Sequence, residues 1–86
     1  MSLYEVVFAS SARRELQALS QATARRILKK VELLASNPRP SGCKKLHGHS
    51  NLWRIRVGDY RIIYSIDDNN QIVDVSIVRH RNEAYH

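Results

Sequence analysis

The middle of the chain contains two short runs in which apolar and polar residues alternate. The first run ends at Val57, the second begins at Tyr60, and the dipeptide Gly58-Asp59 separates them. Alternation with a period of two is typical of half-buried β-strands, and a two-residue connection that contains glycine is typical of a tight hairpin. Because such a turn fixes the strand register, we expect Val57 to face Tyr60 and Arg56 to face Arg61.

The predicted hairpin has one apolar face and one basic face. The apolar face is expected to lie in the core, and its members are Trp53, Ile55, Val57, Tyr60, Ile62 and Tyr64. The other face carries Arg54, Arg56 and Arg61. Like charges directly opposite each other on two strands lie about 5 Å apart at Cβ and destabilise the pair. We therefore interpret the arginine side as a surface that holds an anion. The alternative is a solvated face whose charges only keep the protein in solution.

Hydrophobic periodicity also predicts the elements on either side of the hairpin. Residues 4–8 form a predicted strand, Ser10-Ser11 is expected to cap a first helix, and Ser20 is expected to cap a second helix. The apolar positions of the second helix follow the i, i+3, i+4, i+7 spacing across residues 24–35. The segment 37–42 contains two prolines and is expected to end this helix as a surface loop. A last strand is predicted over residues 71–78.

Together these elements predict a single α+β domain over residues 1–86. The order is β-α-α-β-β-β, and the sheet is expected to be antiparallel with both N-terminal helices packed on its apolar face. The opposite face, which carries the arginines, is expected to remain open. If the last turn is centred on Asp68-Asn69, Arg61 should face Ser76 on the last strand. A turn centred on Asn69-Asn70 instead would leave each residue on the same face of the sheet.

The end of the last strand raises a conflict between its periodicity and its charges. A continued strand would place Arg79 and Arg81 on the core side, where an unpaired guanidinium is very costly. We therefore expect the strand to end near Val78 and the chain to turn or bulge there. That change of direction would bring Arg81 and Tyr85 to the rim of the sheet.

The amino-acid composition indicates which class of molecule binds this domain. Fourteen Lys and Arg residues against eight Asp and Glu give a net charge of +6 and a pI near 10.0, and ten of the fourteen are arginine. Such an excess favours a polyanionic partner, and arginine is suited to bidentate phosphate contacts. The single Cys43 excludes an internal disulfide, and no stretch resembles a signal peptide or a membrane span. We expect a soluble cytoplasmic protein without a metal or another cofactor.

Several of these segments together resemble the RelE toxin family of bacterial type II toxin–antitoxin modules, within the wider RelE/ParE group. The segments that carry the resemblance are Lys45-Leu46-His47-Gly48, Trp53-Arg54-Ile55-Arg56, the run from Tyr60 to Asp67, and His80-Arg81-Asn82-Glu83-Ala84-Tyr85. The resemblance spans essentially all of the chain. It implies a RelE-like fold, similar to that of microbial ribonucleases, and a ribosome-dependent endoribonuclease that cuts mRNA in the ribosomal A site.

The resemblance also implies which residues act. Matched position by position, the site residues are Arg54, Arg56, Arg61, Arg81 and Tyr85. The implied chemistry is a metal-independent attack of a ribose 2′-hydroxyl on the adjacent 3′-phosphate, which gives a 2′,3′-cyclic phosphate and a 5′-hydroxyl. The arginines would stabilise the charge of the transition state by about 2–4 kcal/mol each, and Tyr85 would stack on a base or sugar. Further RNA contacts are expected from Lys44, Lys45 and Arg79.

The chain departs from the family pattern at two positions. The best-known members of the family carry lysine where this chain has Arg54 and Arg56. A lysine can lose its proton when its pKa is depressed, whereas an arginine essentially cannot. We therefore expect one of two mechanisms. Either His80 is the general base, because imidazole titrates near neutrality, or catalysis depends mainly on charge stabilisation.

The resemblance implies two partners, which are mRNA on the ribosome and a cognate antitoxin that silences the toxin in a higher-order complex. An acidic, partly disordered segment of the antitoxin is expected to mask the arginines or to displace the segment from Arg81 to Tyr85. The main alternative function is that of a ParE-like inhibitor of DNA gyrase that cuts no RNA. A pure DNA-binding role ranks last, because no recognition helix stands out.

Overall fold

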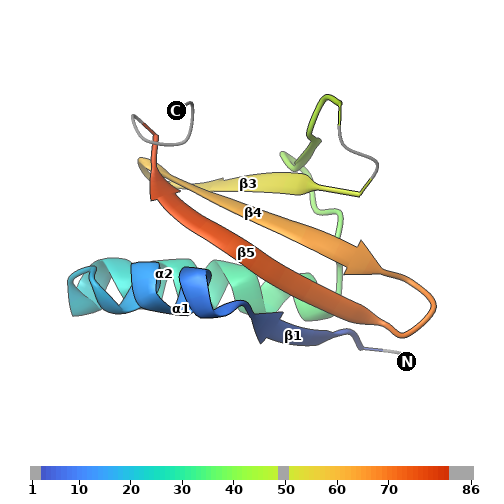
Figure 1. Ribbon diagram of the computed structural model, residues 1–86, viewed down its shortest axis with the longest axis horizontal. Coiled ribbons are helices and arrows are strands. Elements are labelled where there is room, and N and C mark those ends of the chain that lie inside the picture. Colours follow the sequence, from blue (N-terminus) through green and yellow to red (C-terminus); the bar gives the residue numbers. More distant parts are fainter. Residues whose placement is uncertain (1–2, 49–50, 82–86) are drawn as a thin grey trace.

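The structure of the protein is a computed structural model that describes residues 3–48 and 51–81. Two helices lie against one face of a five-stranded sheet (Figure 1). The elements in chain order are β1 (Glu5–Phe8), α1 (Ser10–Gln17), α2 (Gln21–Glu32), the 3₁₀ turn η1 (Leu33–Ala35), β2 (Lys44–Lys45), β3 (Trp53–Val57), β4 (Tyr60–Asp67) and β5 (Ile72–His80). The predicted α+β class, with both helices preceding the hairpin, is confirmed. No helix in the described part of the chain is long and apolar enough to span a membrane.

The sheet differs from the expected antiparallel sheet in two respects. Its strand order is β1-β5-β4-β3-β2, and β1 pairs with β5 in parallel, from Glu5 opposite Ile72 to Phe8 opposite Val75. The short strand β2 was not predicted and pairs with the first two residues of β3. Both pairings join segments with no local signal for each other, because the alternation of a strand shows which residues share a face but not which strand lies beside it.

The β3–β4 hairpin has the predicted register. Val57 lies opposite Tyr60 and Arg56 lies opposite Arg61. In the turn, Gly58 has a φ of 59°, and it is the only turn residue with a positive φ. A positive φ at the first of two central positions is the requirement of a type II′ turn, which glycine meets without strain.

The register predicted for a turn centred on Asp68-Asn69 is wrong for two reasons. The turn is centred on Asn69-Asn70, because Asp67 lies opposite Ile72, and β5 contains a β-bulge. Ile63 lies opposite Ile77 and Tyr64 lies opposite Val75, so Ser76 is the extra residue. Ser76 is held on both sides, since its Oγ donates to the Ile63 carbonyl at 3.2 Å and its own carbonyl accepts from the Ser11 Oγ at 3.1 Å. A bulge reverses the two faces for every residue that follows it.

The bulge resolves the predicted conflict at the end of the last strand. The strand continues to His80 instead of ending near Val78, and Arg61 lies opposite Arg79 instead of Ser76. Arg79 therefore belongs to the arginine face, and the side chain of Arg81 is 63% exposed. The predicted bulge exists, but it precedes the expected position by a few residues.

The core lies between the sheet and the helices. Its largest fully buried side chains are Tyr64, Ile27, Leu34, Ile62, Val31, Val73 and Val75. Trp53 and Tyr60 are partly buried and pack against this core, as the hairpin pattern predicted. The Tyr64 hydroxyl donates to the Pro38 carbonyl at 2.7 Å, so part of the loop after the helices is buried rather than a surface loop.

The caps of the two helices differ from each other. The predicted cap of α2 is confirmed, because the Ser20 Oγ accepts from the Thr23 N–H at 3.3 Å. The predicted serine cap of α1 is wrong, since α1 begins at Ser10, its N-cap is Ala9 and no side chain caps it. The Ser11 hydroxyl hydrogen-bonds to the bulge of β5 instead.

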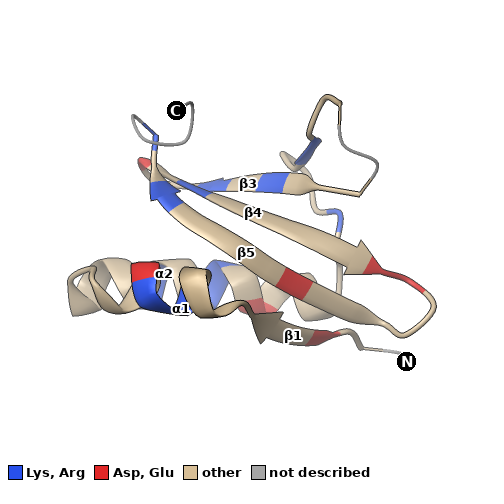
Figure 2. Ribbon diagram, viewed as in Figure 1, with Lys and Arg blue, Asp and Glu red and all other residues tan. Residues whose placement is uncertain are grey.

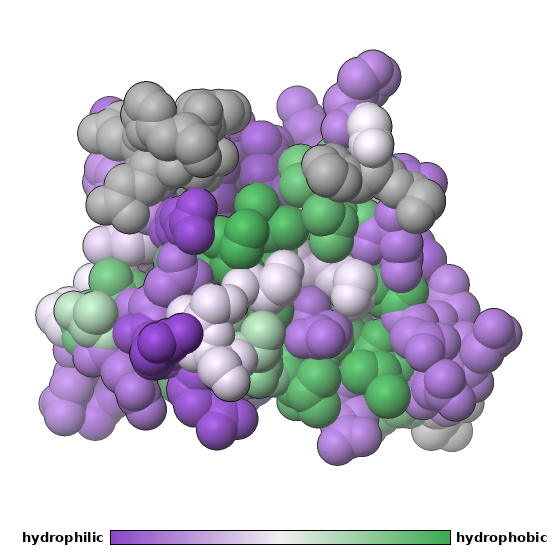
Figure 3. Space-filling model, in the orientation of Figure 1, coloured by the Kyte–Doolittle hydropathy of each residue, from purple (hydrophilic) through white to green (hydrophobic). Residues whose placement is uncertain are grey.

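Apolar and charged residues are separated along the sheet. In the space-filling view, apolar residues gather near the middle of the face that includes β1 and β5, and hydrophilic residues lie towards both sides (Figure 3). The coloured ribbon shows basic residues on the strands near the β3–β4 turn and acidic residues at the β4–β5 turn (Figure 2). The two ends of the sheet therefore carry opposite charge.

Candidate functional site

Three arginines lie side by side on the three middle strands of the sheet, near the β3–β4 turn. Arg56 on β3 is opposite Arg61 on β4, and Arg61 is opposite Arg79 on β5. Residues directly opposite each other on neighbouring strands project from the same face. The type II′ turn fixes the first pair and the bulge at Ser76 fixes the second, so this row is a consequence of two local backbone features.

Two of these arginines and Arg81 line one small pocket beside the hairpin turn. This arginine pocket has a volume of about 120 Å³, and its lining residues are Arg56, Gly58, Asp59, Tyr60, Arg61 and Arg81. Three guanidinium groups around so small a space create a strongly positive potential. The pocket is therefore a candidate site for a phosphate group.

Arg61 is the centre of the arginine pocket. It is 8% exposed, and it is the only charged residue among the described ones that counts as buried. Its Nη1 donates to the Arg81 carbonyl at 2.9 Å, and the Arg81 N–H donates to the Asp59 carbonyl at 2.7 Å. The Arg81 Nη1 also lies 4.0 Å from the Asp59 carboxylate. These contacts hold the backbone after β5 against the β3–β4 turn and thereby place Arg81 next to Arg61.

Arg79 has a different neighbour. Its Nε donates to Glu15 Oε2 at 2.9 Å, and the other carboxylate oxygen of Glu15 accepts from the Val78 N–H at 2.9 Å. Glu15 lies on α1, and its side chain is only 25% exposed because it lies along the edge of β5 beyond β1. Arg79 is thus already paired with a carboxylate and does not line the arginine pocket.

The remaining basic residues of the predicted site lie further along the sheet. Arg54 is two residues from Arg56 on the same face of β3, a distance of about 7 Å along the strand. Lys44 lies opposite Arg54 and thus shares this face. Lys45 lies opposite Trp53, and its Nζ is 5.8 Å from the Trp53 ring centroid, so it belongs to the other face.

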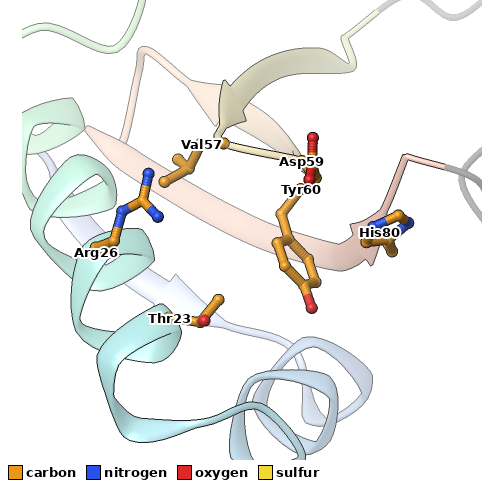
Figure 4. A pocket seen from close by; sticks show the side chains of 7 residues that line it. Thr23, Arg26, Val57, Asp59, Tyr60 and His80 are labelled. Carbon is orange, nitrogen blue, oxygen red and sulfur yellow. The ribbon is translucent and has the colours of Figure 1, made fainter.

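His80 lies on the helix side of the sheet, away from the arginine pocket. It faces Tyr60 across β4 and β5, and the two rings meet edge to face with their centroids 5.4 Å apart. Both line a cavity of about 330 Å³ between the end of the sheet and α2, together with Thr23 and Arg26 (Figure 4). The bulge at Ser76 accounts for this position, because it reverses the faces of all later residues in β5.

Tyr85, the fifth residue implied by the resemblance, lies outside the described residues. Sequence reasoning also missed Asp59 and Glu15, which hold Arg81 and Arg79. The position of Asp59 in the hairpin turn was a usable signal, whereas Glu15 resembles any outward residue of a helix. Among residues 3–48 and 51–81, no three His, Cys, Asp or Glu side chains gather closely enough to hold a metal ion.

At the acidic end of the sheet, Asp68 is paired with a cation and Asp67 is hydrogen-bonded to an uncharged amide. Asp68 accepts from the Tyr4 hydroxyl at 2.6 Å and from Arg39 Nη2 at 2.9 Å. These hydrogen bonds, first that of Arg39, lower the pKa of the Asp68 carboxyl, and Asp68 in turn raises the pKa of Arg39. Hydrogen bonds from Asn70 lower the pKa of Asp67 in the same turn. The charge of Asp68 is therefore neutralised within the molecule by Arg39.

Comparison with known proteins identifies the family. Residues 6–85 match the sequence model of the ParE toxin of the type II toxin–antitoxin system parDE. The chain is 31% identical over 83 residues to the toxin RelE of Mycobacterium tuberculosis, covering 95% of this chain and 86% of that protein. It is 32% identical over 87 residues to a putative RelE-like toxin protein of Escherichia coli, covering 95% and 90%.

Solved structures agree with the sequence match. The archaeal RelE–RelB complex from Pyrococcus horikoshii contains a chain with a TM-score of 0.82 and 31% identity, with 95% of this chain and 99% of that chain covered. The toxin–antitoxin complex RelBE2 from Mycobacterium tuberculosis gives a TM-score of 0.84 and 29% identity, with 96% and 97% covered. The chain belongs to the RelE/ParE family of type II toxin–antitoxin toxins.

Proposed function

We propose that this toxin is a ribosome-dependent endoribonuclease that cuts mRNA in the ribosomal A site and thereby inhibits translation in the cytoplasm. The observation that carries the proposal is the arginine pocket, in which Arg56, Arg61 and Arg81 line one space of about 120 Å³. A phosphodiester that enters this pocket meets three guanidinium groups. Relatives named RelE support the same assignment.

In the proposed reaction, the ribose 2′-hydroxyl attacks the adjacent phosphorus and the 5′-oxygen of the next nucleotide leaves. The products are a 2′,3′-cyclic phosphate and a 5′-hydroxyl. Negative charge on the phosphoryl oxygens grows toward the transition state, so donors fixed in advance stabilise the transition state more than the bound RNA. Arg61 is the best fixed of these donors, because it is buried and hydrogen-bonded to the Arg81 carbonyl.

The proposal assigns charge stabilisation to the arginines and no proton transfer to His80. His80 lies on the helix side of the sheet against Tyr60, whereas the arginine pocket is on the other side. Arg54 and Lys44 are proposed to bind flanking phosphates on the arginine face, and Tyr85 is proposed to stack on a base. Lys45 and Arg79 remain proposed RNA contacts at the rim. A His80→Ala variant is expected to keep its cleavage activity.

A cognate antitoxin is the second proposed partner. Several structural neighbours are toxin–antitoxin complexes with RelB, including those of Pyrococcus horikoshii and Escherichia coli. We propose that this toxin likewise binds an antitoxin, in a higher-order complex, and that an acidic antitoxin segment neutralises the arginine face.

A second candidate function is inhibition of DNA gyrase, which the match to the ParE toxin model favours. Two assays separate the candidates. In a purified translation reaction, primer extension maps new mRNA ends with and without ribosomes. In a supercoiling assay, the same protein is added to gyrase. Cuts within codons that vanish when ribosomes are omitted support the nuclease. Intact mRNA together with blocked supercoiling would replace it by the gyrase inhibitor.

A further inference from the structure

A groove runs along the outer side of α2, next to the end of β3. Its main lining residues are Arg26, Lys29, Lys30, Leu33, Arg56 and Val57, and its volume is about 430 Å³. A separate cavity of about 330 Å³, which reaches Tyr60, adjoins this groove and shares Arg26, Val57 and Gly58 with it (Figure 4). We call the groove beside Leu33 the α2 groove. No step of the proposed reaction uses it.

The helical repeat of α2 places four of these residues on one stripe. Arg26, Lys29, Lys30 and Leu33 follow the i, i+3, i+4, i+7 spacing, beside the stripe of Ile27 and Val31 that enters the core. Positive charges four residues apart repel each other and destabilise a helix. The ion pairs found among the described residues involve other cations. The stripe therefore keeps its positive charge available for an external partner.

The exposure of Leu33 indicates which class of partner binds the cationic stripe. It is 59% exposed, and besides Leu3 it is the only exposed large apolar residue in the described part of the chain. Phosphates of a nucleic acid would account for the lysines but not for an exposed leucine beside them. A protein segment with both carboxylates and aliphatic side chains accounts for both, since interfaces combine an apolar centre with a polar rim.

The open edge of β3 gives the α2 groove one hydrogen-bond donor and one acceptor from the main chain. β2 pairs only with Trp53 and Arg54, so the edge of β3 near Arg56 is uncovered by any other described strand. In a hairpin with a two-residue turn, the pair next to the turn exchanges hydrogen bonds and the following pair does not. The peptide groups of Arg56 therefore point away from β4 towards this open edge, where an extended chain can pair with them.

We propose that the α2 groove docks an extended acidic segment of a partner protein. An aliphatic side chain of that segment packs on Leu33 and Val57, and its carboxylates pair with Lys29 and Lys30. Because Arg56 lines both the α2 groove and the arginine pocket, the bound segment also draws this guanidinium away from the pocket. The proposal rests on the proposed function only in identifying this partner with the antitoxin.

Fluorescence anisotropy with the full chain tests this docking directly. The probe is a labelled, glutamate-rich peptide that contains two leucines. Leu33→Gln and the pair Lys29→Gln/Lys30→Gln are each expected to weaken binding about tenfold, the loss typical of a central contact in an interface. The matched controls are Leu3→Gln, which removes a leucine of similar exposure, and Arg13→Gln/Arg14→Gln, which removes the same charge from the exposed face of α1. Both controls are expected to bind like the wild type.

Two results would overturn the proposal. If the control pair on α1 weakens binding as much as the pair on α2, the peptide responds only to net charge. The second result concerns a single-stranded RNA of the same charge as the peptide. If this RNA displaces the peptide as well as unlabelled peptide does, and Leu33→Gln changes the affinity for neither the RNA nor the peptide, the groove binds phosphates rather than a protein segment. The assay contains no ribosomes, so its failure leaves the nuclease proposal intact. Likewise, a protein that binds the peptide but cuts no mRNA refutes only the nuclease.

Discussion

The two ends of the sheet are built from similar side chains but reach opposite electrostatic states. At the β4–β5 turn, Asp68 is hydrogen-bonded to both Tyr4 and Arg39, so the charges cancel within the molecule. At the β3–β4 turn, Arg56, Arg61 and Arg81 line one pocket, and among the described residues Asp59 is the one acidic residue on that lining. The first arrangement ties the loop after the helices to the sheet. The second gathers three like charges around one small space.

The contrast shows that this small domain places its stabilising ion pair and its cluster of like charges at opposite ends of the sheet. The neutralised pair of Arg39 and Asp68 joins segments that lie 29 positions apart in the sequence. Arg56 and Arg61 lie on one hairpin, whose register is already fixed by its two-residue turn. Because local geometry holds the hairpin, the repulsion between Arg56 and Arg61 is tolerated there.

The largest expected effect is the loss of mRNA cleavage in Arg61→Ala. Removal of one fixed donor to a developing oxyanion typically lowers the rate by about 10²–10³-fold, and Arg61 is the buried donor of the pocket. Primer extension in the translation assay measures the rate. Asp68→Asn, which disrupts the opposite end, is the matched control and is expected to cleave at the wild-type rate. Equal losses in both variants, or a thermally unfolded Arg61→Ala protein, would contradict the assigned role of Arg61.

Tyr64→Phe tests the packing of the loop near the acidic end. The Tyr64 residue is fully buried, and its hydroxyl donates to the Pro38 carbonyl at 2.7 Å. Without this hydroxyl the buried carbonyl loses its donor, which lowers the free energy of unfolding by about 1–3 kcal/mol. Urea denaturation measures the change. Tyr60→Phe removes a hydroxyl from the other end of β4 and is expected to change stability far less, so equal losses would refute this assignment.

Acid pH is expected to weaken the acidic end selectively. Hydrogen bonds from Arg39 and Tyr4 lower the pKa of Asp68, and those from Asn70 lower the pKa of Asp67. A lowered folded-state pKa means that the stabilisation is complete above the unfolded value, about 3.9, and is lost as the pH falls through the folded value. The double variant Asp67→Asn/Asp68→Asn should therefore unfold at lower temperature than the wild type at pH 7. The two melting temperatures should converge as the pH falls below about 4, and a gap that persists at about pH 2 would exclude this linkage.

The same contrast explains which parts of the molecule could be predicted from the sequence. The hairpin register and the Arg56–Arg61 pair depend on a two-residue turn and a period of two, which are local signals. The parallel pairing of β1 with β5 and the closed Arg39–Asp68 pair join distant segments, so no local pattern indicated them.

The bulge at Ser76 lies between these two cases. Periodicity showed that Arg79 and Arg81 could not follow Val75 and Ile77 into the core, so some irregularity was required. Its position depended on hydrogen bonds of Ser76 with Ile63 and with Ser11 on α1, which only the tertiary structure supplies. The same displacement moved His80 to the helix side and removed it from the predicted site.

The smallest expected effect is a rise in melting temperature caused by inorganic phosphate at the basic end. A ligand that binds only the folded protein adds about 0.4 kcal/mol when its concentration equals its dissociation constant. For a domain of this size that corresponds to about 2–3 °C. Thermal unfolding in phosphate is compared with sodium chloride of the same ionic strength. The pair Arg56→Gln/Arg81→Gln should abolish the rise, whereas Arg13→Gln/Arg14→Gln should keep it. A rise that survives the first pair would mean that phosphate binds elsewhere, and that the arginine pocket does not form an anion site.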